Sequence, residues 1–87
     1  MEKNTREHHN KLTNQFVALA NKMKDDGDDI NLISAALMAS SAIYATYITS
    51  GNEGYLQQSG IDKVANTYKE NLAFIQEVKK VEQEEKQ

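Results

Sequence analysis

The chain has 87 residues, of which 26% are charged, and its formal net charge at pH 7 is −3. A chain of this length forms one domain and buries only about 60% of the surface that its unfolded form exposes. The ten basic residues are spread among thirteen acidic ones and there is no cysteine, which argues against a general nucleic-acid-binding protein and excludes disulfides and thiolate metal sites.

Helix breakers are rare and occur at few places in the chain. Proline is absent, and the four glycines stand at positions 27, 51, 54 and 60. They leave three stretches that predict helices at about 5–24, 29–50 and 60–81, followed by a polar tail at 82–87 that is expected to fray. Because short connections make neighbouring helices antiparallel, we predict a single all-α domain over 1–87, an up-down-up three-helix bundle.

The first predicted helix begins near Asn4, which can cap it while Glu7 reaches back from the third position. Its apolar residues recur at spacings of four, three and four, which places them on one stripe: Leu12, Phe16, Leu19 and Met23. The polar segment before this stripe lacks the apolar run of a secretory signal, so a cytoplasmic location is expected.

An acidic turn, DDGDD, follows at residues 25–29. A calcium-binding EF-hand loop needs acids at alternating positions before its glycine and a glutamate at the twelfth position, and this spacing does not meet that pattern. We expect instead that Gly27 supplies the turn and that Asp28 or Asp29 caps the next helix.

The second predicted helix contains no charged residue between Ile30 and Ser50. At about 100° per residue it presents a bulky face, with Ile30, Ile33, Leu37, Tyr44 and Ile48, and a face of small or weakly polar residues. The segment is long enough to cross a bilayer. It is rich in hydroxyl and amide side chains, however, and no lysine or arginine flanks it closely, so no membrane association is expected.

The third predicted helix has Ser59 as its expected N-cap, with Asp62 at the matching acidic position. Its main face carries Ile61, Val64, Tyr68, Leu72 and Ile75, and a narrower strip carries Phe74, Val78 and Val81. In a bundle, the first and third helices can cover the bulky side of the second helix, and the small-residue face is left open. An uncharged open face of this kind predicts a homodimer with the second helix near its axis. The residues expected at this contact are Ser34, Ala35, Met38, Ala42, Ala45 and Thr49, with Phe74 and Val81 as a secondary contact.

Three segments together, FVALANKM, ISAALMASSAIYATYI and VANTYKENLAFI, resemble a family of short bacterial helical proteins of unknown function. The resemblance extends from about Phe16 to Ile75. It implies a small cytoplasmic all-helical protein, and it implies no reaction, ligand or catalytic residue.

Antiparallel packing would also gather polar side chains at one end of the bundle: His8, His9, Tyr47, Glu53, Tyr55 and Asp62. Adjacent histidines on a helix diverge by about 100°, so one metal ion cannot easily bind both. Ser40 and Ser41 lack a glycine elbow and a base, so neither is expected to be a nucleophile. We therefore predict no catalytic, cofactor or metal site, and a non-enzymatic interaction or scaffold module that pairs with itself and with some other protein. The alternative is a small-molecule-binding protein or minor enzyme with a pocket near His8, His9 and Tyr55.

Overall fold

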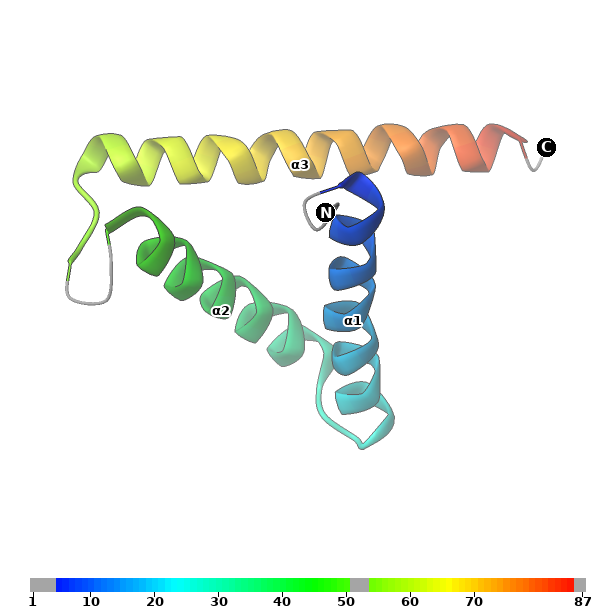
Figure 1. Ribbon diagram of the computed structural model, residues 1–87. Helices are drawn as coiled ribbons and strands as arrows, with labels where there is room; N and C mark the ends of the chain where they lie inside the picture. Colours follow the sequence, from blue (N-terminus) through cyan, green and yellow to red (C-terminus); the bar gives the residue numbers. More distant parts are fainter. Residues whose placement is uncertain (1–4, 51–53, 86–87) are drawn as a thin grey trace. The chain divides into compact units, whose positions relative to one another are not determined.

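The computed structural model of the chain describes residues 5–50 and 54–85. Over these residues the backbone forms α1 (Arg6–Asp25), α2 (Ile30–Ser50) and α3 (Gln58–Glu85), with no strand among them (Figure 1). The all-α prediction is confirmed. The chain divides into two compact units, Met1–Ser41 and Ala42–Gln87, with the boundary inside α2. The single domain and the up-down-up bundle stay predictions.

The ends of the first two helices lie within one residue of the predicted bounds, but α3 is longer at both ends. The expected fraying from Glu82 is wrong for residues 82–85, which are helical. Glutamate, glutamine and lysine are good helix formers. In addition, Lys79 Nζ lies 3.9 Å from Glu82 Oε1 one turn away, an exposed pair that contributes little on its own. Residues 86 and 87 lie outside the described part of the chain.

The structure shows which polar residue caps the N-terminal end of α1 and of α2. The N-cap of α1 is Thr5, whose Oγ1 accepts a 3.1 Å hydrogen bond from the His8 amide, whereas the expected cap, Asn4, lies outside the described residues. Asp29 Oδ2 accepts from the Leu32 amide at 3.1 Å, as predicted for the start of α2. The prediction for α3 is wrong, because that helix begins before Ser59.

At the start of α3, the first backbone bond runs from the Ile61 amide to the carbonyl oxygen of Gln57, at 3.0 Å. Gln58 Nε2 donates to Asp62 Oδ1 at 2.8 Å. Ser59 therefore lies within the first turn of the helix, and the partner of Asp62 is a glutamine side chain one turn earlier.

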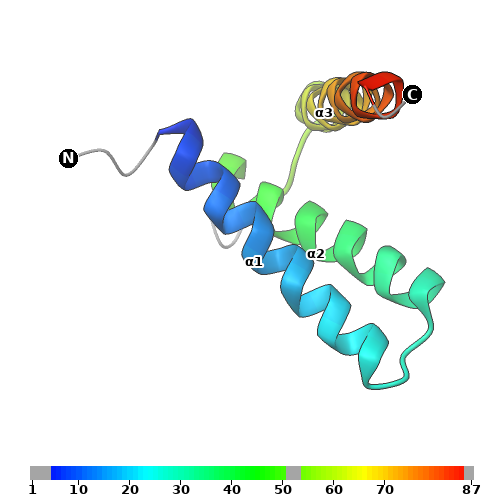
Figure 2. The same cartoon turned by 90° about the vertical axis from the view of Figure 1, so that its right-hand side faces the viewer.

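The turn between α1 and α2 is a Schellman motif (Figure 2). The Asp28 amide donates to the Met23 carbonyl and the Gly27 amide to the Lys24 carbonyl, both at 3.0 Å. Gly27 has φ of 108°, a conformation that residues with a Cβ rarely adopt. The prediction that Gly27 supplies this turn is confirmed, and the bonds commit α1 and the start of α2 to a hairpin.

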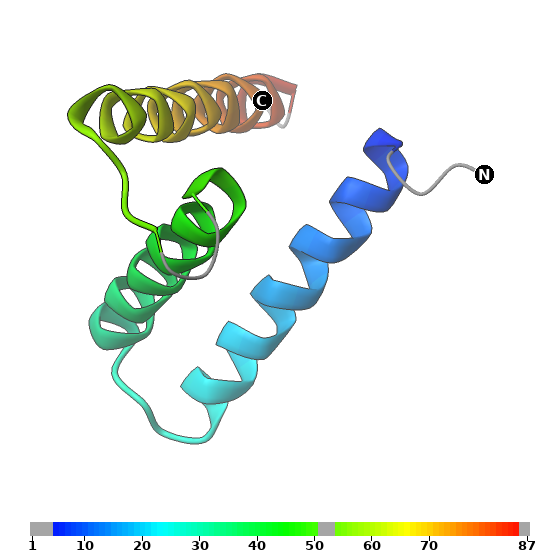
Figure 3. The ribbon, with the colours of Figure 1, turned by 60° about the vertical axis from the view of Figure 1, so that its left-hand side comes forward.

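Packing in the first unit is confined to the part of this hairpin near the turn. Ile33 has 8% of its surface exposed and is the buried apolar side chain among the described residues of the whole chain. Ala20, on α1, is half-buried. From the turn, α1 and the first half of α2 diverge (Figure 3), and Phe16, further along α1, is 65% exposed. The apolar stripe of α1 is therefore uncovered over most of its length.

The second unit contains the end of α2 and all of α3. At the start of α3 the Leu56 side chain packs against Gly60, where an added Cβ would lie 3.3 Å from Leu56 Cδ2. On α2 the rings of Tyr44 and Tyr47 make an edge-to-face contact, with centroids 6.3 Å apart. Among the residues of this unit whose side chains are described, the half-buried ones are Ala45, Thr46, Leu56, Gly60 and Val64.

The first prediction concerns the turn. Gly27→Ala should lower the free energy of unfolding by about 1–2 kcal/mol, because alanine is strained at positive φ. Gly60→Ala is the matched control: it lies in a helix, where alanine is favoured, and its Cβ would contact the Leu56 side chain, with 3.3 Å to Cδ2 and 3.5 Å to Cβ. Urea denaturation followed by circular dichroism measures both, and an equal loss in the two variants would contradict the role given to Gly27.

The second prediction concerns the only close packing in the hairpin. Ile33→Ala should cost about 2–4 kcal/mol, because it leaves a cavity where the side chain is buried. Leu37→Ala lies one turn along the same face and is half exposed, so it should cost less than about 1 kcal/mol. The comparison is made by urea denaturation at the lowest protein concentration that circular dichroism allows. A larger loss for Leu37→Ala would show that the core lies elsewhere.

Candidate interaction surface

The exposed surface of α2 is uncharged on every side. The helix has 21 residues and none is charged. Its bulky face, which α1 and α3 would cover in the predicted bundle, is buried at Ile33 and exposed at Ile30, Leu37, Tyr44 and Ile48. Ile48 is 76% exposed. In the first unit, α1 diverges from α2 and does not cover this face beyond the turn (Figure 3).

The neighbouring face of α2 carries the small residues that were predicted to meet a second copy. Ser34, Ala35 and Ala42 are exposed, as is Met38, and Ala45 is half-buried. The side chain of Thr49 lies outside the described residues. Thr46 Oγ1 donates to the carbonyl oxygen of Ala42 at 2.9 Å, so this hydroxyl is bonded along its own helix. The result is a flat face of small side chains on which another helix backbone can come close.

The length and composition of α2 also satisfy the criterion for a membrane span, over Ile30–Ile48. This is the one such helix in the described part of the chain. A core helix of a soluble protein passes the same test when it is mostly buried, whereas only 6% of this window is buried. Sequence reasoning recognised the length but expected other helices to cover the segment.

On α3, two apolar surfaces are exposed. The main face, predicted to pack within the chain, consists of Ile61, Val64, Tyr68, Leu72 and Ile75, of which Val64 alone is half-buried. The second surface is the strip of Phe74, Val78 and Val81, with Phe74 60% and Val81 47% exposed. A shallow, open depression on this strip is lined by Glu77, Val78, Val81 and Glu82. The strip therefore has an apolar floor and acidic edges.

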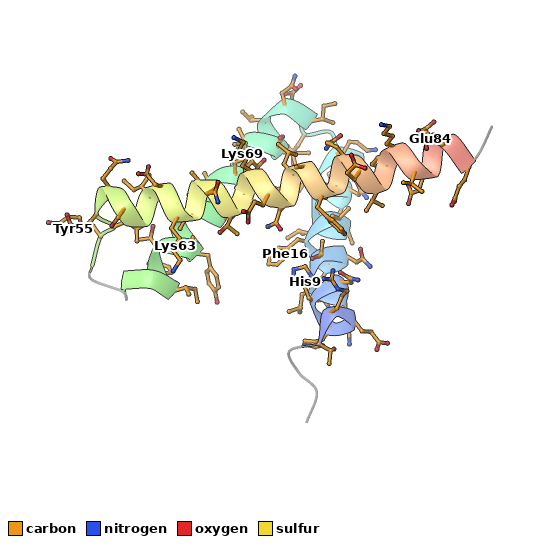
Figure 4. The ribbon with its side chains drawn as sticks, turned by 90° about the horizontal axis from the view of Figure 1, so that it is seen from above. His9, Phe16, Tyr55, Lys63, Lys69 and Glu84 are labelled. Carbon is orange, nitrogen blue, oxygen red and sulfur yellow. The ribbon has the colours of Figure 1, made fainter. Side chains whose placement is uncertain are left out.

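The polar residues predicted at one bundle end belong to both units, and each is described within its own. In the first unit His8 is half-buried, and His9 is exposed with Nδ1 3.3 Å from Asn10 Oδ1 (Figure 4). In the second unit Tyr47 and Tyr55 are exposed, and the ring of Tyr55 points away from the start of α3 (Figure 4). Asp62 is bonded to Gln58 as described above.

Two further findings concern this predicted cluster. Glu53 lies outside the described residues. Among the residues that the structure does describe, no three histidine or carboxylate side chains are placed to hold a metal ion. The alternative of a small-molecule site near His8, His9 and Tyr55 gains no support from the geometry within either unit.

Comparison with protein-family models, with curated proteins and with solved structures finds no match to this chain. The resemblance to a family of short bacterial helical proteins stays a prediction.

Proposed function

We propose that this protein is a non-enzymatic interaction module of the cytoplasm that self-associates as a homodimer through α2. The observation that carries the proposal is that α2 has 21 uncharged residues and a single buried apolar side chain, Ile33, among those described. Burying apolar surface contributes about 25 cal/mol per Å² removed from water. A helix exposed in this way gains stability from any partner that covers it.

Twofold symmetry favours a second copy of the chain as the partner of α2. Close to a twofold axis a side chain meets its own equivalent in the second copy, so a charge there would meet a like charge. Among the three helices of the described chain, α2 alone has no charge. The small side chains of Ala35 and Ala42 also allow the two helix backbones to approach closely.

In this proposal the chain follows an up-down-up path, with consecutive helices antiparallel, and the dimer supplies the core that one copy lacks. The polar side chains of α2 favour this protein partner over lipid. Asn31, Ser34, Ser40 and Ser41 are exposed along the first two-thirds of the helix. The residues that precede α2 are aspartates, not the lysines or arginines that anchor a span in headgroups.

The third prediction tests this contact. Ala42→Glu should convert the dimer into a monomer, because a carboxylate on the α2 face would be buried beside its symmetry mate. Helical content should change little, since glutamate is a good helix former. Light scattering across a protein concentration series measures the mass, and circular dichroism measures the helix.

Ala73→Glu provides the matched control, because it places the same substitution at an exposed position on the polar side of α3. It should leave the dimer intact. A wild-type chain that is monomeric at all concentrations would overturn the proposal, as would an Ala42→Glu variant that stays dimeric. Flotation of the wild-type chain with phosphatidylcholine and phosphatidylglycerol vesicles would instead identify lipid as the partner of α2.

A further inference from the structure

The charges of this protein are divided unequally among its helices. α1 contains four basic and two acidic residues, α2 contains none, and α3 contains four basic and six acidic residues. On α1 and on α3, charged side chains lie along the edges of an exposed apolar surface. We infer that α1 of one copy docks, antiparallel, on the Phe74–Val78–Val81 strip of α3 in the second copy.

The strip on α3 has acidic edges. At about 100° per residue, Glu70, Glu77 and Glu84 fall within about 40° of one another along one edge. Glu82 lies on the other edge, about 75° from the centre of the strip. The lysines of α3 nearest in height, Lys69, Lys79 and Lys80, all lie more than about 120° from the centre of the strip. Lys79 Nζ is 3.9 Å from Glu82 Oε1, an exposed pair that contributes little. A partner helix on this strip therefore meets carboxylates on both sides.

On α1 an exposed apolar stripe also lies between charged edges, but there the charged residues are basic. The apolar stripe of Leu12, Phe16, Leu19 and Met23 is exposed. Lys11 and Lys22 lie within about 20° of each other along one edge, and Arg6 and Lys24 along the other. Lys22 Nζ bonds Asp26 Oδ2 at 3.0 Å, but both side chains are largely exposed, and such a pair contributes little. The edges of α1 complement those of α3.

The spacings of the charges along the helix axes agree to within one helical turn. Lys11 and Lys22 are eleven residues apart, about 16 Å along α1, while Glu70 and Glu84 are fourteen residues apart, about 21 Å along α3. Each apolar stripe lies between its charged edges. One helix can therefore place both lysines beside carboxylates while its phenylalanine and leucines cover the valines of the other.

The acidic turn indicates that the α1 involved belongs to the second copy. In an up-down-up chain α1 and α3 run parallel, so the turn with Asp26, Asp28 and Asp29 would lie at the end where α3 finishes. α3 finishes with Glu82, Glu84 and Glu85, and carboxylates brought together in this way repel one another. A contact within one chain would therefore be opposed at its most highly charged point.

The α1 helix of a second copy does not have to run parallel to α3. Its α1 can run antiparallel to α3, which sets its N-terminal end, with Arg6 and Lys11, beside the acidic end of α3. The positive end of the α1 dipole adds to this attraction. The inference rests on the proposed self-association through α2 and specifies which α3 lies beside α1 in the dimer.

The fourth prediction uses charge reversal on each helix. Lys11→Glu with Lys22→Glu, and separately Glu77→Lys with Glu84→Lys, should each weaken dimerisation about tenfold, because the contact occurs twice in a symmetric dimer. A 1:1 mixture of the two variants should recover wild-type affinity and form mixed dimers, which native mass spectrometry resolves. Lys69→Glu with Lys80→Glu is the control, since it reverses two charges away from the strip and should leave affinity unchanged.

A chain that carries all four reversals separates the remaining possibilities and guards against variants that misfold. If this chain recovers the dimer but the mixture does not, the contact lies within one chain and the inference is overturned. It is also overturned if neither pair of reversals changes affinity. In that case loss of the dimer in Ala42→Glu would leave the α2 interface standing. A monomeric wild-type chain would remove both proposals together.

Discussion

The constraint on which the structure depends is the absence of charge along α2. A helix with 21 uncharged residues has no side to present to water at low cost, so each of its faces requires a neighbour. The chain contains two other helices, and both are amphipathic: α1 has one apolar stripe, and α3 has a main apolar face and a narrower strip. The described packing covers Ile33 and leaves the rest of the apolar surface of α2 open. The proposed second copy would cover the apolar surface of α2 that this packing leaves open.

The Schellman turn explains why α1 and α2 pack together near the turn and not further along. Its two backbone bonds and the positive φ of Gly27 fix the direction in which α2 leaves α1. Side chains close to the turn, such as Ala20 and Ile33, are brought together by this short connection. Packing beyond the first turns depends on contacts between side chains further along both helices.

The sequence was sufficient to predict the three helices, because glycine is confined to the connections and proline is absent. It was less informative about which residue ends a helix, since Asn4 and Thr5, or Gln58 and Ser59, are neighbours with competing side chains. Helical periodicity located the apolar stripes correctly. It could not show that Leu37 and Ile48 would be exposed, because burial depends on where other segments lie and periodicity reports one helix at a time.

The distribution of charge adds a second level of specificity to the apolar surfaces. Uncharged faces such as that of α2 provide affinity but discriminate poorly between partners and orientations. Basic edges on α1 and acidic edges on α3 favour one pairing, α1 with α3, over α1 with α1 or α3 with α3, since like-charged edges would meet in both of the latter. In the proposed dimer, the acidic turn opposes a parallel arrangement of α1 and α3. The signs of a few exposed side chains would thus favour one partner helix and one orientation of it.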